Sequence, residues 1–242
     1  MDSEAKGDET MIVQIYSLTD PDDVRSLVAL GVDYVGVAPA GQGLRSELGH
    51  EAVRELFALL PPTMLGVALT VQTDLDAIVA MAEDVRPSIV HICSPTEALT
   101  VAEQRRLRSL LPEGTKIMKA IEVGGPETAD GAIDAAERFA GVSDFYILDT
   151  DDPAIPGIGA AGQVHDWDIS ARIVERVGAQ VPVILAGGLS PDNVAAAIRH
   201  VRPAGVDSYT WTNMASNSRR KDPERVRAFV QEARRAAAAL GL

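Results

Sequence analysis

The chain contains a single cysteine, Cys93, in 242 residues. No intrachain disulfide can form, which fits the reducing conditions of the cytoplasm. The sequence also has no run of about 18 consecutive apolar residues, so we expect no membrane-spanning helix. Residues 1–10, MDSEAKGDET, are polar and acidic. This pattern is typical of a disordered tail and not of a secretory signal, which needs an apolar centre.

Basic residues are outnumbered, with 22 Lys and Arg against 35 Asp and Glu and a net charge of −13. A negative field of this kind disfavours binding to nucleic acid or to an anionic membrane surface. A phosphate site would therefore need local backbone N–H groups and a few arginines. No group of His, Cys and Asp residues has metal-ligand spacing, so we expect neither a metal ion nor a cofactor.

Apolar, β-branched runs alternate along the chain with segments in which apolar residues recur at helical spacing. Such alternation indicates parallel strands, and eight units in about 240 residues match a single α/β domain, a (β/α)8 TIM barrel, over residues 11–242. An open doubly wound sheet is the alternative, but the stretch after the first strand, YSLTDPDD, lacks the glycines of a dinucleotide site. The expected strands are 11–16, 33–38, 64–70, 88–93, 116–121, 144–149, 181–186 and 204–209, and the expected helices are 21–30, 49–60, 74–84, 97–110, 127–140, 168–178, 191–199 and 222–239.

Three helix starts carry a capping side chain followed by a proline at the first helical position, which is a strong start signal. They are Asp20-Pro21, Ser190-Pro191 and Asp222-Pro223. The longest stretch without a pattern is 150–167, and a loop of this length after a strand is usually functional. It contains GIGAAG, which does not open a helix and which we interpret as a lid over a pocket.

The active site of such a barrel lies at the carboxyl ends of its strands. Asp149 ends the apolar run FYILD, where a carboxylate is costly to desolvate. It is either a general acid or base with a raised pKa or a strand-end cap. Because side chains alternate along a strand, we place the following inside the barrel: Gln14, Tyr16, His91, Cys93, Ile117, Lys119, Phe145, Ile147, Asp149, Asp207 and Tyr209.

Two glycines, Gly187 and Gly188, follow the seventh expected strand in ILAGGLSPDNV. They either let the backbone bind a phosphate, as loops after strands seven and eight of this fold often do, or serve a tight turn. Arg45 is an anion clamp or a solvated loop residue. Lys119 is a Schiff-base amine or the partner of an acid.

The remaining polar candidates are less specific. His91 and His165 are possible site residues, whereas His50 and His200 resemble helix-end residues. Cys93 is either a relocated base or a buried structural thiol.

Nearly the whole chain, from about Met11 to the last helix, resembles the phosphoribosylanthranilate isomerase family of the tryptophan pathway. The most specific match is VILAGGLSPDNVAAAIRHVRPAGVD, and further matches are SLTDPDDVRSLVALGVDYVGV, VRELFALLPP, IMKAI, YILDT, HDW and KDPERVRAF. The resemblance implies a (β/α)8 barrel that rearranges an aminoaldose phosphate into an aminoketose. It also implies that Asp149 protonates the ring oxygen of a phosphorylated, sugar-like ligand.

The chain departs from the family pattern at two strand ends. The catalytic cysteine of the first strand is replaced by Tyr16, and the Ser-Ser-Gly turn after the eighth strand by SYTWTN, with Trp211 near the glycine position. A free tyrosine has a pKa near 10 and a free cysteine one near 8.5, so the phenolate costs roughly 2 kcal/mol more to hold at neutral pH. Tyr16 is therefore better interpreted as a pocket wall or hydrogen-bond donor.

Several functions stay open at this point. The leading hypothesis is an isomerase or lyase that acts on a phosphosugar-like molecule with Asp149 as acid or base. The alternatives are the original isomerase with weak activity, a ligand-binding barrel without catalysis, and an aldolase that uses Lys119. A homodimer also stays open. The candidate catalytic residues are Asp149 and Tyr16, and the candidate ligand- or phosphate-binding residues are Arg45, His91, Cys93, Lys119, Gly187, Gly188, Asp207 and Ser208.

Overall fold

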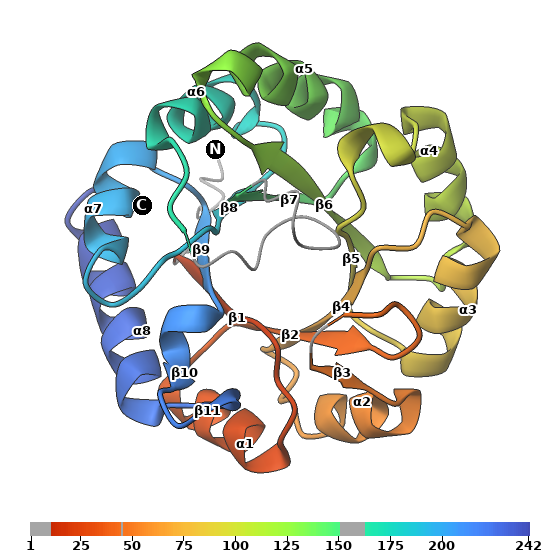
Figure 1. The fold of residues 1–242 in the computed structure, drawn as a ribbon, viewed down its shortest axis with the longest axis horizontal. Coiled ribbons are helices and arrows are strands. Elements are labelled where there is room, and N and C mark those ends of the chain that lie inside the picture. The colour runs from red at the N-terminus through yellow and green to blue at the C-terminus, as the bar shows by residue number, and fades with distance from the viewer. Residues whose placement is uncertain (1–10, 45, 151–162) are drawn as a thin grey trace, which may run out of the picture.

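Eight parallel strands close into a barrel inside a ring of helices, as the computed structural model shows (Figure 1). The structure describes residues 11–44, 46–150 and 163–242. Predictions for the first ten residues, Arg45 and the GIGAAG segment lie outside the described residues. The barrel strands are β1 (Ile12–Ile15), β2 (Tyr34–Pro39), β4 (Leu65–Thr70), β5 (Ile89–Ile92), β6 (Lys116–Val123), β7 (Phe145–Thr150), β8 (Val183–Leu185) and β9 (Gly205–Ser208).

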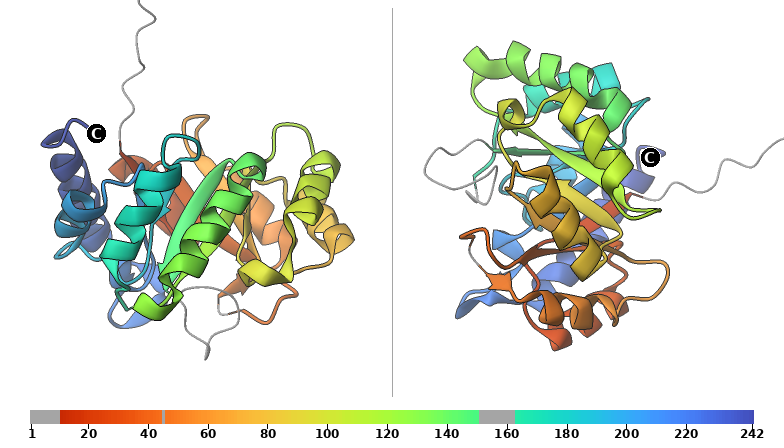
Figure 2. Two further views of the ribbon diagram at one scale, coloured as in Figure 1. Left: turned by 90° about the horizontal axis from the view of Figure 1, so that it is seen from above. Right: turned by 90° about the vertical axis from the view of Figure 1, so that its right-hand side faces the viewer.

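The helices cover the outside of the barrel, and the side views show them beside the strands (Figure 2). They are α1 (Pro21–Leu30), α2 (His50–Phe57), α3 (Leu75–Val85), α4 (Val101–Leu110), α5 (Ala129–Phe139), α6 (Trp167–Val177), α7 (Val194–Val201) and α8 (Pro223–Ala238). No helix among the described residues is long and apolar enough to cross a membrane.

The strand order is β1-β9-β8-β7-β6-β5-β4-β2, and β1 pairs with β2 to close the barrel. All of these pairings are parallel. The predicted fold class is therefore confirmed. The register places Gln14 of β1 beside Asp207 of β9. The ends of the first and last barrel strands are thus direct neighbours at the mouth.

Short elements that the periodicity did not indicate occur in the connections. The two-residue strand β3 (Glu47–Leu48) extends the sheet beside β2. A hairpin of β10 (Asn213–Met214) and β11 (Asn217–Lys221) lies between β9 and α8. Short 3₁₀ helices are η1 (Thr96–Ala98), η2 (Pro126–Thr128), η3 (Ala140–Val142) and η4 (Thr210–Thr212).

Two of the three predicted helix starts are confirmed. Asp20 accepts a hydrogen bond from the backbone of Asp22 and begins α1, and Asp222 caps α8 in the same way. The Ser190-Pro191 prediction was wrong, because α7 begins at Val194. Before it, the Asn193 carboxamide accepts from the Ser190 amide and stabilises a turn. Local side-chain bonding therefore delays this helix.

Two apolar layers hold the fold together. The larger layer lies between the strands and the helices, and the smaller one fills the barrel. The inner layer includes Tyr16, Cys93, Met118 and Ile147, which confirms the predicted facing of β1, β5 and β7. Because both faces of a parallel sheet are buried, its strands are apolar on both sides.

The predicted facing of β6 was wrong. Met118 and Ala120 point into the barrel, whereas Ile117 belongs to the outer layer. Lys119 follows Ile117, and its Nζ lies 5.7 Å from the ring centroid of Phe139 on α5. It donates a 2.9 Å hydrogen bond to the Ser94 carbonyl. Lys119 thus lies in the strand–helix layer.

Candidate active site

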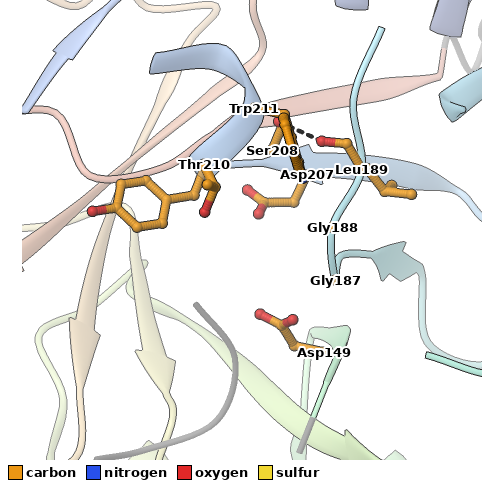
Figure 3. Close-up of a pocket in the computed structure, with 9 residues that line it drawn as sticks. Asp149, Gly187, Gly188, Leu189, Asp207, Ser208, Thr210 and Trp211 are labelled. Carbon is orange, nitrogen blue, oxygen red and sulfur yellow. Dashed lines mark hydrogen bonds between the residues drawn. The ribbon is translucent and has the colours of Figure 1, made fainter. Parts of the chain in front are cut away.

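The carboxyl ends of β7 and β9 and the loops after β8 and β9 form a pocket at the barrel mouth (Figure 3). Acids from two strands face the same space, and the paired glycines follow the strand between them. The sequence reasoning placed the acids and the glycines together, and the structure brings them together. The lining residues are Asp149, Gly187, Gly188, Leu189, Asp207, Ser208, Tyr209, Thr210 and Trp211.

The two carboxyl groups are the titratable centre of this pocket. Burial raises the pKa of Asp149 to about 7, although a hydrogen bond from the Thr150 amide opposes the rise. Burial and the Asp149 charge raise the pKa of Asp207 to about 8. The pair therefore gives up its first proton near neutral pH, and that proton belongs to both groups. One acid and one base can thus coexist here at physiological pH.

The surroundings favour placing the negative charge on Asp207. The Gln14 amide donates a 3.1 Å hydrogen bond to its Oδ1. The ammonium of Lys221 on β11 also lowers the pKa of Asp207. Asp149 receives only the Thr150 amide among the contacts resolved for the described residues. The pKa of Asp207 is nevertheless the higher of the two, because its rise includes the charge of an already ionised Asp149. When the pair carries a single negative charge, the Gln14 hydrogen bond and the Lys221 ammonium stabilise that charge on Asp207, so Asp149 is the better place for the proton.

Lys221 was not a sequence candidate, although its charge reaches the site. Its side chain is only 1% exposed, and Nζ donates to Asn213 Oδ1 at 2.6 Å and to the Tyr209 carbonyl at 3.3 Å. Nζ also lies 4.9 Å from the Tyr209 ring centroid. Burial lowers the pKa of Lys221 to about 7, and the charge of Asp207 opposes this.

Tyr16, at the end of β1, spans the barrel to β5. Its hydroxyl lies 2.8 Å from Nδ1 of His91, and the two rings meet edge to face. Burial and the charges of Cys93, Asp207 and Asp149 hold the Tyr16 pKa well above its usual value. Burial lowers the pKa of His91 to about 3. Two neutral rings therefore fill the barrel beside the acids, and a tyrosinate base is disfavoured.

The paired glycines have a structural reason of their own. A Cβ on Gly187 would lie 2.6 Å from Thr150 Oγ1 and 2.7 Å from His165 Nδ1. A Cβ on Gly188 would lie 2.6 Å from the Gln163 carbonyl carbon. Both residues also have positive φ angles of 78° and 61°. Their missing side chains therefore accommodate the chain that returns to the barrel, independently of any ligand.

Among the other candidates, His165 and Lys119 lie away from the lining, whereas Ser208 is part of it but has a structural role. His165 is buried against Ser170, with its Nε2 2.7 Å from the serine hydroxyl, and so acts as a packing residue. Ser208 donates a 2.8 Å hydrogen bond to the Leu189 carbonyl and ties β9 to the β8 loop. Lys119 faces the helices, which removes the geometric basis of a Schiff base in this pocket. Within the described ranges no cluster of three His, Cys, Asp or Glu residues could hold a metal ion.

The fold and this acidic pocket define a (β/α)8 barrel of the kind that moves protons on a small molecule at its mouth. Comparison with known proteins gives the particular family. The family model of N-(5′-phosphoribosyl)anthranilate isomerase matches residues 13–232. The chain belongs to this family, as the resemblance of the sequence implied.

Curated relatives agree with this assignment. N-(5′-phosphoribosyl)anthranilate isomerase of Haloferax volcanii is 33% identical over 229 residues, covering 94% of this chain and 95% of the relative. Isomerase 2 of Methanosarcina mazei is 34% identical and covers 93% and 94%.

Solved structures share the fold. The Pyrococcus furiosus isomerase superposes with a TM-score of 0.74 at 21% identity and covers 93% of this chain and 99% of its own. A phosphoribosylanthranilate isomerase bound to reduced 1-(o-carboxyphenylamino)-1-deoxyribulose 5-phosphate gives a TM-score of 0.70 at 24% identity and covers 92% and 98%.

Proposed function

We propose that this chain is an isomerase that rearranges a sugar-like aminoaldose into an aminoketose, with Asp149 as general acid and Asp207 as general base. The observation that carries the proposal is the shared lining of one pocket by two carboxyl groups with raised pKa values. The family assignment supports the reaction class, and the hydrogen bonds of the site support the two roles.

The reaction needs a general acid that donates one proton and a general base that removes another. Protonated Asp149 donates to the ring oxygen as the C1–O bond breaks, and the nitrogen lone pair forms C1=N. Ionised Asp207 then takes the C2 proton, and the C–H electron pair forms C1=C2 and neutralises the nitrogen. The resulting enolamine gains the proton of Asp207 at C1 and returns its hydroxyl proton to Asp149. Both acids recover their starting states, so no cofactor enters the balance.

Asp207 is proposed as the base because of its position beside the first strand. Tyr16 follows β1, where the family cysteine is expected, and its amide donates to the Ser208 carbonyl of β9. The catalytic base would thus come from β9 and not from its neighbour β1. A neutral phenol at Tyr16 is compatible with this arrangement because it need not ionise.

The test measures turnover of N-(5′-phosphoribosyl)anthranilate and of the same compound without its phosphate. In D₂O up to one deuterium should enter the aminoketose at C1, in proportion to the exchange of the Asp207 proton with solvent, and mass spectrometry measures it. Asp149→Asn and Asp207→Asn should each lower kcat by roughly 10²–10⁴-fold, the usual contribution of a general acid or base. Asp168→Asn, on an exposed side chain of α6, is the matched control. Binding without turnover would identify a non-catalytic barrel, and full activity of either pocket variant would reject its role.

A further inference from the structure

A chain of hydrogen bonds ends beside the proposed general acid. The amide of Thr150, at the end of β7, donates a 2.8 Å hydrogen bond to Asp149 Oδ1. The Thr150 hydroxyl donates at 2.8 Å to the carbonyl of Gln163, which lies 13 residues further along the chain. His165 Nδ1 lies 3.3 Å from the same hydroxyl oxygen, and its Nε2 lies 2.7 Å from the Ser170 hydroxyl on α6. The end of β7 is thus tied to α6 through the His165 ring.

The partners in this chain assign the protons of the His165 ring. A carbonyl oxygen only accepts, so the proton of the Thr150 hydroxyl lies on the bond to Gln163. The Thr150 oxygen therefore accepts from Nδ1–H of His165, and Nε2, which has no proton, accepts from the Ser170 hydroxyl. Burial lowers the pKa of His165 to about 4, and the charge of Asp166 opposes this. The ring is therefore neutral near pH 7 and is not the source of the reaction's proton.

Packing holds these groups against the wall of the pocket. His165 is 8% exposed, and Ser170 is fully buried. The lining residue Gly187 lies against their contact with β7, because a Cβ there would be 2.6 Å from Thr150 Oγ1 and 2.7 Å from His165 Nδ1. The backbone after β8 thus packs on the Thr150–His165 hydrogen bond. Loss of one partner would leave the other unsatisfied in a crowded place, so the contact favours one conformation of Thr150.

We propose that His165 is a positioning residue for the general acid, which holds the Thr150 side chain so that the Thr150 amide stays on the Asp149 carboxyl group. The role of Asp149 in this inference rests on the proposed function. His165 is not among the described residues that line the pocket, and it reaches the acid through Thr150. A hydrogen bond to a carboxyl oxygen stabilises the ionised form and fixes the direction of the group. Loss of the His165 contact should therefore raise the pKa of Asp149 and misplace its proton.

Other titratable groups surround this chain of contacts and have to stay constant in a test. They are Glu122 of β6, which is beside Asp149 in the register, Asp207 of β9, Tyr16 after β1, Lys221 of β11, which acts on Asp207, and Asp166 next to His165. The substitutions that test the inference leave all of these residues in place. Their charges therefore contribute to the wild-type and variant profiles alike.

Two substitutions break the chain at different points. His165→Phe keeps a flat ring and removes both nitrogens, and Thr150→Val keeps the branched shape and removes the hydroxyl. Each should lower kcat by about 10- to 100-fold, since displacement of a catalytic group by about 1 Å costs up to this factor, and should change KM by less than about threefold. The alkaline limb of the kcat/KM profile, which reports loss of the Asp149 proton, should move up by roughly 0.5–1 pH unit, the equivalent of one hydrogen bond. The acid limb, which reports Asp207, should stay in place.

Two further variants separate the ring nitrogens. The amide nitrogen of Asn lies near the position of Nδ1 and that of Gln near the position of Nε2. His165→Asn should therefore return the alkaline limb to its wild-type position, whereas His165→Gln should behave as His165→Phe does. The double variant of Thr150→Val and His165→Phe should shift the limb no further than either single variant, because both act through one contact.

A buried amide elsewhere in the fold provides the control. Gln104 on α4 is fully buried and donates a 2.8 Å hydrogen bond to the Ser143 hydroxyl. Gln104→Leu should lower the melting temperature and leave both limbs in place. An alkaline limb that does not move in Thr150→Val or in His165→Phe, a shift that His165→Asn does not reverse, or additive shifts in the double variant would overturn the inference. If His165→Phe does not fold, Thr150→Val and His165→Gln decide.

The pH dependence of unfolding gives a second measurement that needs no turnover. In Thr150→Val and His165→Phe the stability curve should level off at a higher pH than in the wild type, because the folded-state pKa of Asp149 rises. A shifted stability curve in a protein without turnover would retain the role of His165 and reject the isomerase. Turnover with an unmoved limb and an unshifted curve would retain the isomerase and reject the role of His165.

Discussion

Gly36 of β2 and Tyr16 after β1 fit each other in a way that excludes any larger residue at position 36. A Cβ on Gly36 would lie 2.6 Å from three ring atoms of Tyr16. Real Cβ atoms do not approach other atoms so closely, and the ring is held in place by His91. The tyrosine at the strand end therefore depends on a glycine in the neighbouring strand.

Gly36→Ala should destabilise the protein by about 1–3 kcal/mol, the usual cost of overpacking a core. The same substitution in a Tyr16→Ala background should cost much less, because the obstructing ring is gone. Chemical denaturation of the wild type, both single variants and the double variant gives the coupling energy. Gly141→Ala is the control, since a Cβ there meets nothing within 4 Å. Additive effects of the two substitutions would contradict the proposed fit.

Tyr16→Phe tests whether Tyr16 is a wall of the pocket or a catalytic base. The loss of the hydroxyl that contacts His91 should cost about 1–2 kcal/mol of stability, since it leaves a buried ring nitrogen without its partner. Turnover should fall by no more than about threefold if the phenol stays neutral. Tyr146→Phe removes another buried hydroxyl, which donates to the Ala136 carbonyl, and provides a control for stability. A loss of kcat of about 100-fold or more in Tyr16→Phe alone would return Tyr16 to the list of catalytic groups.

The barrel itself could be predicted because each unit carries its own period and start signals. Asp20 and Asp222 cap helices as their proline neighbours indicate. The facing of β6 could not be predicted in the same way. Its sequence KIMKAIEV is apolar on both faces because the barrel interior and the helices both bury it. A shift of one residue in the assumed alternation then decides whether the Lys119 side chain points into the barrel or toward the helices.

The acids of the site could be predicted from their strand ends, but their neighbours could not. Lys221 stands in RRKDP, a run that indicates a solvated surface, yet the β10–β11 hairpin folds it beneath Tyr209. The glycine pair correctly indicated that another group lies close to the backbone at these two positions. The approaching group is the protein's own chain, and pattern alone does not distinguish it from a ligand.

Ionisation of the acid pair should make the fold less stable as the pH rises. The folded-state pKa of Asp149 is about 7, against 3.8 for the free group. Between these values the folded chain holds a proton that the unfolded chain has released, so the free energy of unfolding falls with rising pH. Below about pH 4 both states are protonated, and above about pH 7 the loss is complete.

Asp149→Asn removes this linkage. Relative to the wild type, its free energy of unfolding should rise by on the order of 2–4 kcal/mol between pH 4 and pH 8. Urea denaturation of both proteins across this range measures the difference. Repeating the series at 1 M salt screens the general surface charge but leaves the buried group largely unscreened. Parallel stability curves for the two proteins would show that Asp149 ionises freely in the folded state.

Lys221→Met tests whether the buried ammonium positions the charge of the base. Methionine keeps much of the side-chain volume, and loss of the positive charge makes ionised Asp207 less favourable. The pKa of Asp207 should therefore rise, and the acid limb of the kcat/KM profile should move to higher pH. Lys116→Met is the matched control, because Lys116 is at the opposite end of its strand, near Phe145. A merely structural role of Lys221 would change the melting temperature and leave the acid limb in place, whereas a limb that moves to lower pH would reverse the assigned sign.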